Sequence, residues 1–321
     1  MRDKIPSPCY VLEEALLRKN LELIAGVQER AGVSIILALK GFSMWKTFPF
    51  VKKYLSGATA SSLHEARLIY EEMGCKAHTY AVAYMPDEFE EMLKYSSHLV
   101  FNSVAQYEFF RPQIEAYSEH VSCGIRVNPE YSEVETELYN PAAPGSRLGE
   151  VEDKFLNGLP KGIEGLHFHT LCESTSYELE KTLAVLENKF GHLLPLLKWV
   201  NMGGGHLMTK KGYDTDHLVK ILTDFRKKHD VEILLEPGSA IAWETGDLYA
   251  NVMDIHESRG IKTAILNMSF TAHTPDCLEM PYRPKVVGAT DPIEGKPTYR
   301  LGGVSCLAGD YLTEYSFEKP L

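Results

Sequence analysis

The sequence has no paired cysteine motif. Its six cysteines are scattered along the chain, with no C-x-x-C pair and no spacing typical of a zinc site. This pattern favours reduced thiols in a cytoplasm over a disulfide framework, and we predict no metal site. The six residues are Cys9, Cys75, Cys123, Cys172, Cys277 and Cys306.

A long apolar run is also missing. The first residues include Arg2, Asp3 and Lys4, followed by Pro6 and Pro8, and they contain no apolar core of signal-peptide length. No stretch elsewhere is long and apolar enough to span a bilayer. We therefore expect neither a secretory signal nor a membrane partner.

Basic residues are outnumbered by acidic ones. The chain has 33 Lys and Arg against 44 Asp and Glu, and a formal net charge of -11. This balance argues against a nucleic-acid partner, which would need a basic face, and it is compatible with a cationic substrate. A length of 321 residues, with 44% hydrophobic and 24% charged residues, suits a soluble enzyme built from one barrel and an added domain.

Strand and helix patterns alternate through the first three quarters of the chain. Eight apolar segments read as strands, most of them are followed by an amphipathic helix, and a long loop at 128–149 interrupts the series. Such a series predicts a parallel α/β architecture, and eight units predict a closed (β/α)8 TIM barrel over residues 11–242. The predicted strands are 34–40, 58–62, 77–83, 98–101, 121–127, 165–170, 198–202 and 231–235.

The pattern changes after about Trp243. Short alternating segments separated by Gly and Pro turns replace the helices, and no helix is evident. We predict a second, all-β domain from residues 243–321 together with residues 1–10. Its expected strands are 247–255, 263–268, 285–288 and 297–301.

Lys40 ends the buried-strand pattern Ser34-Ile-Ile-Leu-Ala-Leu-Lys40 and is followed by Gly41. Strands often end in a solvated lysine, which is the simpler interpretation. The alternative is an imine-forming lysine, whose amine condenses with the carbonyl group of a cofactor or substrate.

Three other predicted strand ends carry groups suited to chemistry. His167 and His169 alternate onto one face of their strand, which could equally be a satisfied polar pair. Gly203-Gly204-Gly205 could cradle a phosphate with its amides or simply form a tight turn. Glu236-Pro237-Gly238 ends the last barrel strand.

Together these groups match the needs of pyridoxal 5'-phosphate (PLP). The aldehyde needs Lys40, the ring face needs a flat partner such as His169, and the phosphate needs the glycine amides. The pyridine nitrogen needs the carboxylate of Glu236, which holds it protonated so that the ring accepts electrons.

At these residues the sequence resembles the fold-type III PLP-dependent decarboxylases, whose barrel is alanine racemase-like. The shared motifs are Gly165-Leu-His-Phe-His169, Met202-Gly-Gly-Gly-His206 and Glu236-Pro-Gly238. Three longer motifs are similar to those of the carboxynorspermidine decarboxylase family, which also acts on carboxyspermidine. These motifs are 139–149, 275–284 and 302–310.

The resemblance implies further roles. Cys306 matches a cysteine that crosses a homodimer interface and protonates the carbanion left after carbon dioxide departs. Asp276 and Asp310 are implied near the amines of a carboxylated polyamine substrate, and Arg147 near its carboxylate. The cofactor-binding set implied by the resemblance is Lys40, His169, Cys172, Gly203, Gly204, Gly205, Glu236 and Gly238.

The chain departs from the wider pattern at three points. Ser239 stands where ornithine and diaminopimelate decarboxylases have arginine, and Cys172 stands where they have serine. The chain ends at Leu321, whereas the family continues for a few dozen residues, so we expect a shortened β domain.

Other functions stay open at this stage. The chain could be another fold-type III decarboxylase, of the diaminopimelate, ornithine or arginine type, or a racemase. It could be a non-catalytic homologue, although such proteins usually lose the lysine or the cysteine. A metal-dependent barrel hydrolase would use His167 and His169, but there the histidine pair precedes the lysine in the chain.

Overall fold

The computed structural model describes residues 5–280 and 282–321, which divide into two compact units. One unit is Glu14–Thr245, and the other combines the N-terminal residues through Glu13 with Gly246–Leu321. Within the described residues, no helix has both the length and the apolar character required to cross a membrane.

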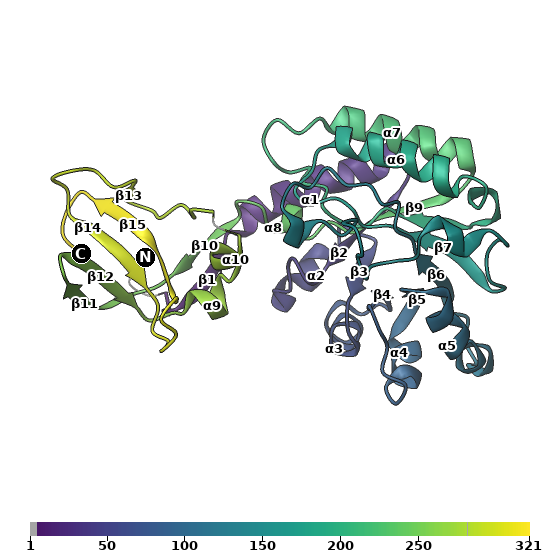
Figure 1. Cartoon of the computed structure of the whole chain (residues 1–321), viewed down its shortest axis with the longest axis horizontal. Helices are drawn as coiled ribbons and strands as arrows, with labels where there is room; N and C mark the ends of the chain where they lie inside the picture. Colours follow the sequence, from purple (N-terminus) through teal and green to yellow (C-terminus); the bar gives the residue numbers. More distant parts are fainter. Residues whose placement is uncertain (1–4, 281) are drawn as a thin grey trace. The chain divides into compact units, whose positions relative to one another are not determined.

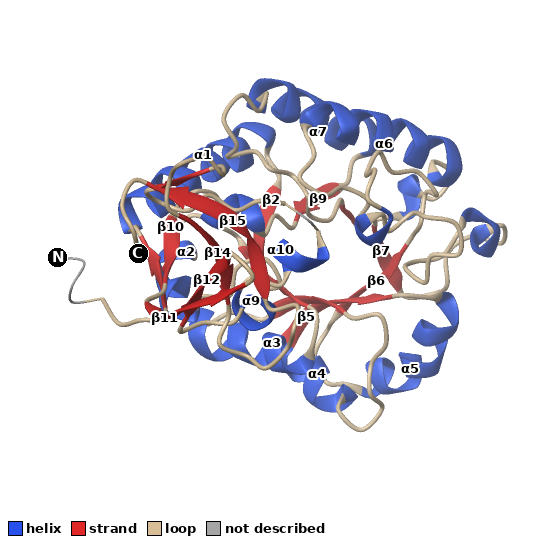
Figure 2. Cartoon of the chain, turned by 60° about the vertical axis from the view of Figure 1, so that its left-hand side comes forward, coloured by secondary structure: helices blue, strands red, loops and turns tan. Residues whose placement is uncertain are grey.

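The larger unit is a closed barrel of eight parallel strands, as predicted. Helices form an outer ring around these strands (Figure 2). The strands, in their order around the barrel, are β2 (Ser34–Ala38), β3 (Gly57–Ala60), β4 (Ala77–Tyr80), β5 (Ser96–Phe101), β6 (Ser122–Arg126), β7 (Ile163–His167), β8 (Trp199–Asn201) and β9 (Glu232–Leu235).

Barrel closure joins the first and last of these strands. In parallel register, Ser34 of β2 lies opposite Leu234 of β9, and Ile35 lies opposite Leu235. Residues about two hundred positions apart in the chain are thereby made neighbours. The carboxyl ends of all eight strands meet at one end of the barrel, where barrel enzymes place their active sites.

Several helices of this unit begin at a residue whose side chain caps the first turn. Ser103 caps α5 by accepting a hydrogen bond from the amide of Gln106. Thr175 and Glu178 form a capping box at the start of α6. The helices are α1 (Glu14–Ala31), α2 (Phe48–Val51), α3 (Leu63–Leu68), α4 (Phe89–Tyr95), α5 (Val104–Ala116), α6 (Ser176–Phe190), α7 (Thr215–His229) and α8 (Ser239–Ala242).

The smaller unit contains a two-stranded and a five-stranded sheet. The first pairs β1 (Cys9–Leu12) with β10 (Gly246–Tyr249). The second has the order β11-β12-β14-β15-β13, and all of its pairs are antiparallel except β12 with β14. Its strands, labelled in Figure 1, are β11 (Val252–Ser258), β12 (Ile261–Leu266), β13 (Ala289–Thr290), β14 (Thr298–Gly302) and β15 (Tyr311–Phe317).

Several predicted elements of this unit were wrong. The expected strand 247–255 is two strands broken after Tyr249, and 285–288 is not a strand. Two one-turn helices, α9 (Phe270–His273) and α10 (Asp276–Glu279), lie where no helix was expected. The last strand, β15, was missed; its residues Leu312 and Tyr315 are buried in the core of this unit, but an irregularity in its pairing with β14 breaks the two-residue period.

Candidate active site

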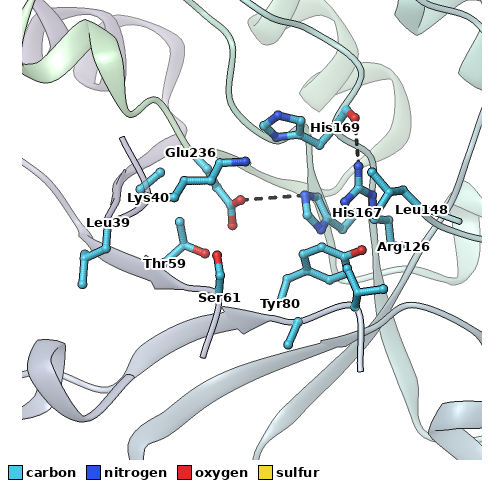
Figure 3. A pocket seen from close by; sticks show the side chains of 13 residues that line it. Leu39, Lys40, Thr59, Ser61, Tyr80, Arg126, Leu148, His167, His169 and Glu236 are labelled. Atoms are coloured by element: carbon cyan, nitrogen blue, oxygen red, sulfur yellow. Dashed lines mark hydrogen bonds and ion pairs between the residues drawn. The ribbon is translucent and has the colours of Figure 1, made fainter. Parts of the chain in front are cut away.

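A cavity of about 250 Å³ lies at the carboxyl ends of the barrel strands. The side chains that line it come from six strand ends, and Figure 3 shows them converging from different strands. Among the lining residues are Lys40, Thr59, Tyr80, Arg126, His167, His169 and Glu236.

Lys40 points into this cavity from the turn that follows β2 (Figure 3). The run Ile35–Leu39 before it is buried, as the apolar pattern predicted. Burial among protein atoms lowers the pKa of the Lys40 amine, the nearby carboxylate of Glu236 raises it, and the guanidinium of Arg126 lowers it. The net shift is downward, so a larger share of the amine is neutral and nucleophilic at neutral pH.

Glu236 follows β9 and is buried in the wall of the same cavity. Its Oε1 accepts a hydrogen bond of 2.6 Å from Asn201 Nδ2, and its Oε2 lies 3.7 Å from His167 Nε2. Burial raises the pKa of this carboxyl, against the hydrogen bond from Asn201 and the charges of Lys40 and Arg126. The site therefore holds a carboxyl group whose charge depends on cationic or hydrogen-bonding partners.

Both predicted histidines line the cavity, although β7 ends at His167 and His169 lies just beyond it. His169 Nδ1 accepts a hydrogen bond of 2.9 Å from the amide of Gly204, which fixes the plane of the ring and leaves the proton of the neutral form on Nε2. Neither ring nitrogen of His167 has a hydrogen-bond partner within the described residues. Burial holds the pKa of both rings well below the usual range.

The amides of the glycine loop, expected to cradle a phosphate or to form a tight turn, are partly engaged by protein groups. The Gly203 amide donates to Asn201 Oδ1 at 2.9 Å, and the Gly204 amide donates to His169. The Gly205 amide has no acceptor in the part of the chain that the structure describes. At least two of the three amide donors are thus occupied by protein groups. The expectation that all three glycine amides bind a phosphate is therefore corrected.

Close backbone packing explains why this loop is glycine. A Cβ atom at Gly204 would lie 2.4 Å from the carbonyl oxygen of Glu236, and one at Gly205 would lie 2.2 Å from that of Leu171. Gly203 and Gly205 also have φ of +69° and +86°, a region that other residues rarely adopt. The loop is therefore packed directly against the segments that carry His169 and Glu236.

Three residues of the site were not singled out from the sequence, namely Arg126 and Tyr80 in the cavity wall and Asn201, which contacts Glu236. Arg126 ends β6, is only 5% exposed, donates to the carbonyl of His169 at 3.1 Å and lies 4.8 Å over the ring of Tyr80. It forms no ion pair with a carboxylate among the described residues. The signal was available, because Arg126 ends an apolar strand pattern just as Lys40 does. Tyr80 and Asn201 had no such signal in the sequence.

The comparisons with known proteins agree with this geometry. No protein-family model matches the chain. A carboxyaminopropylagmatine decarboxylase from Synechocystis sp. is 49% identical over 318 residues, covering 99% of this chain and 82% of that protein. A carboxynorspermidine/carboxyspermidine decarboxylase from Campylobacter jejuni is 44% identical over 330 residues, covering 99% of this chain and 85% of that protein. The chain belongs to the carboxynorspermidine/carboxyspermidine decarboxylase family.

Solved structures place this decarboxylase in the same fold. The crystal structure of the Campylobacter jejuni carboxynorspermidine decarboxylase complexed with norspermidine matches with a TM-score of 0.89 and 42% identity, over 99% of this chain and 85% of that one. The diaminopimelate decarboxylase from Helicobacter pylori complexed with L-lysine matches with a TM-score of 0.76 at 18% identity, over 99% of this chain and 87% of that one, which shows the fold alone. The predicted alanine racemase-like barrel with an added β domain is confirmed.

The remaining predicted residues of the larger unit lie around the cavity rather than in its wall. Gly238 approaches Gly41 so closely that a Cβ atom on either would lie within 3 Å of the other's Cα. Cys172 is half-buried and near enough to Lys40 to affect its pKa. Arg147 is exposed on the loop that contributes Leu148 to the cavity wall.

Three predicted residues belong to the smaller unit of the decarboxylase. Cys306 is exposed on the turn between β14 and β15, not buried in a strand, and Asp276 is exposed at the start of α10. Asp310 is buried, and its two oxygens accept hydrogen bonds from Phe270 N, Thr271 N, Ser305 N and Ser305 Oγ. Within this unit, Asp310 anchors the base of the Cys306 turn. Its predicted contact with substrate stays a prediction.

Proposed function

We propose that this decarboxylase uses PLP to remove the carboxyl group of a carboxylated polyamine, in the carboxynorspermidine and carboxyspermidine class, giving norspermidine or spermidine and carbon dioxide. The observation that carries the proposal is that Lys40 and Glu236 project into one cavity at the carboxyl ends of the barrel strands. An amine with a lowered pKa and a buried carboxylate are the two groups that this cofactor needs most.

The residues of the cavity fit the cofactor. Lys40 would hold its aldehyde, Glu236 its ring nitrogen, and the fixed ring of His169 one face of its ring. For the phosphate we propose the amide of Gly205, together with Cys172 and Gly238; the Cys172 amide itself already donates to Ser174 Oγ at 3.2 Å. When bound, PLP supplies an electron sink for the electron pair left behind by carbon dioxide.

The chain's own residues prepare this chemistry. Burial and Arg126 lower the pKa of Lys40, which raises the share of its amine that is neutral and nucleophilic. Asn201 holds the carboxylate of Glu236 in one orientation, and a protonated ring nitrogen bound there would favour the ionised form of Glu236. Arg126 is a buried cation without a carboxylate partner in the described part of the chain, so it favours a ligand that brings an anionic oxygen into the cavity.

We infer that the active unit is a homodimer in which Cys306 of one subunit holds the proton delivered to the other subunit's reaction centre. The exposed position of Cys306 supports this role, because a buried thiol could not reach a partner. Arg147 is proposed to contact the substrate carboxylate, and Asp276 and Asp310 the substrate amines. We place the enzyme in the cytoplasm because all six cysteines are free thiols.

A second substrate of the same class has a specific observation in its favour. The relative with 49% identity is named for carboxyaminopropylagmatine, whose agmatine part ends in a guanidinium group. A guanidinium needs a planar, bidentate acceptor, whereas an ammonium group needs only a point charge. The group at the end of the substrate away from its carboxylate, a guanidinium or an ammonium, therefore distinguishes carboxyaminopropylagmatine from carboxynorspermidine and carboxyspermidine.

An absorbance spectrum of the purified protein, followed by assays of carbon dioxide release, tests the proposal. We expect a visible cofactor band that Lys40→Ala abolishes, and turnover of carboxylated polyamines. Ornithine, lysine, arginine and diaminopimelate should be decarboxylated far less efficiently. A short diamino acid as the best substrate would contradict the substrate class while leaving the cofactor assignment intact.

A further inference from the structure

Two loops border the cavity of the larger unit and meet at one asparagine. The first begins at Tyr80, the last residue of β4, and contributes Tyr80 and Val82 to the cavity wall, and the second contributes Leu148. We propose that Asn102 is a positioning residue that holds both loops in place for substrate recognition. This inference rests on the proposed function, since it assumes that the substrate extends from the cavity along these loops.

The side-chain amide of Asn102 is used at both of its ends. Its Nδ2 donates to the carbonyl oxygen of Arg147 at 2.9 Å. Its Oδ1 accepts from the amide of Gly149 at 2.9 Å and from the hydroxyl of Tyr80 at 2.8 Å. A carbonyl oxygen has two lone pairs, and both are engaged here. Turning the amide over would set donor against donor and acceptor against acceptor, so its orientation is fixed.

Asn102 itself stands on a rigid support. It directly follows β5 and precedes Ser103, the residue that caps α5. Its backbone amide donates to Gln106 Oε1 at 3.0 Å, and Gln106 Nε2 donates to the carbonyl of Val82 at 3.0 Å. From the junction between β5 and α5, the two amide side chains therefore hold the first loop at both Tyr80 and Val82.

The second loop is seated equally closely. Gly149 has φ of +86°, and a Cβ atom there would lie 3.0 Å from the backbone carbon of Val127, just after β6. The loop thus packs against the end of β6. Hydrogen bonds to Asn102 fix it at Arg147 and Gly149, on either side of Leu148. The side chain of Leu148 is presented to the cavity as a result.

Tyr80 connects this arrangement to the reacting end of the cavity. Its ring lies edge-on to His167, with centroids 5.3 Å apart, and under the guanidinium of Arg126. A shift of Tyr80 would therefore disturb its contacts with both His167 and Arg126 in the cavity wall. Misplacement of binding groups by about 1 Å can cost up to a hundredfold in rate. Because the Asn102 side chain fixes both loops, its loss should impair substrate binding.

Asn102→Asp is the most informative substitution. The carboxylate keeps acceptors for Tyr80 and Gly149 but cannot donate to Arg147, whose carbonyl would then face a negative charge. Asn20→Asp is a matched control, because Asn20 Nδ2 also donates to backbone carbonyls, those of Ile241 and Trp243, away from the cavity lining. Both variants lose amide donors inside the larger unit, but only one loses a contact to the loops.

The experiment combines hydrogen exchange of the PLP-loaded protein with steady-state kinetics on a carboxylated polyamine. For Asn102→Asp we expect faster exchange at residues 141–149 and KM raised about tenfold with kcat changed less than about twofold, because substrate placement weakens while the cofactor site is kept. Asn20→Asp should leave KM and exchange at residues 141–149 as in the parent protein, even if its Tm falls equally.

Unchanged exchange and unchanged KM in Asn102→Asp would overturn the inference. A similar change of KM in both variants would also overturn it, because the effect would then be general loosening. If the parent protein releases no carbon dioxide from any carboxylated polyamine, the proposed function fails instead. The exchange at residues 141–149 would still decide whether Asn102 holds the loop.

Discussion

Asn201 donates a 2.6 Å hydrogen bond to the buried carboxylate of Glu236 and accepts one of 2.9 Å from the amide of Gly203. One side chain at the end of β8 thus ties the carboxylate proposed for the cofactor's ring nitrogen to the glycine loop. Because the donor is an amide and not a charged group, it orients Glu236 without neutralising it.

The first prediction concerns this bond. Asn201→Asp would replace a donor by a second carboxylate next to Glu236, which raises the pKa of Glu236 further because two adjacent carboxylates cannot both ionise easily. We expect kcat at neutral pH to fall by about tenfold or more, and activity to recover as the pH rises, since higher pH restores the ionised form. A pH profile of kcat with the same shape as that of the parent enzyme would contradict this role.

The second prediction concerns the nucleophilicity of Lys40. Its pKa is lowered by burial and by Arg126 and raised by Glu236. The apparent pKa for the reaction of PLP with the apoprotein, followed by borohydride trapping at Lys40, should therefore lie below that of an ordinary lysine. Arg126→Met should move this pKa upward, and Glu236→Gln should move it downward. Shifts of both variants in one direction would show that the two charges do not act on Lys40 as proposed.

The third prediction concerns Asp310 and acid stability. Burial raises the pKa of this carboxyl, but hydrogen bonds from Ser305, Ser269 and the amides of Thr271 and Phe270 outweigh it, and the net shift is downward. A carboxyl with a depressed folded-state pKa stabilises the fold above its unfolded value, about 3.9, and loses this contribution as the pH falls through the folded-state value.

Asp310→Asn should therefore cost about 1–3 kcal/mol in the free energy of unfolding at pH 7, because charge-assisted hydrogen bonds are lost. The difference from the parent protein should shrink below about pH 4, where the parent loses the same contribution. Urea unfolding followed by circular dichroism at pH 7 and pH 3 measures both. A stability difference that does not depend on pH would rule out the ionised carboxylate as its source.

The fourth prediction concerns the sharing of active sites between subunits. Lys40→Ala and Cys306→Ala should each be inactive alone. In a C2 dimer with Cys306 supplied by the partner, an equal mixture after subunit exchange should regain about a quarter of the parent activity, since about half of the dimers carry one competent site. Mass spectrometry must show heterodimers in the mixture. Heterodimers without activity would contradict a shared site.

Local patterns in the sequence were sufficient for the barrel and for the positions of Lys40 and Glu236. Buried parallel strands read as apolar runs, and the residue that ends such a run must lie at the carboxyl edge of the sheet. The same reasoning placed the histidine pair in the cavity. In the smaller unit local patterns found β12 and β14 but not β13 (Ala289–Thr290), because so short a strand carries too few residues to show a period.

The contacts within the site were decided by the tertiary structure. Barrel closure sets β2 beside β9 and so brings Lys40 next to Glu236, which no local pattern encodes. The Gly204 amide is used by His169, which approaches from the end of the neighbouring strand β7, whereas Asn201 reaches the Gly203 amide from only two residues earlier in the chain. The hold of Asn102 on two loops likewise depends on where distant segments meet. Secondary structure follows from neighbours in the chain, whereas hydrogen-bond partners follow from neighbours in space.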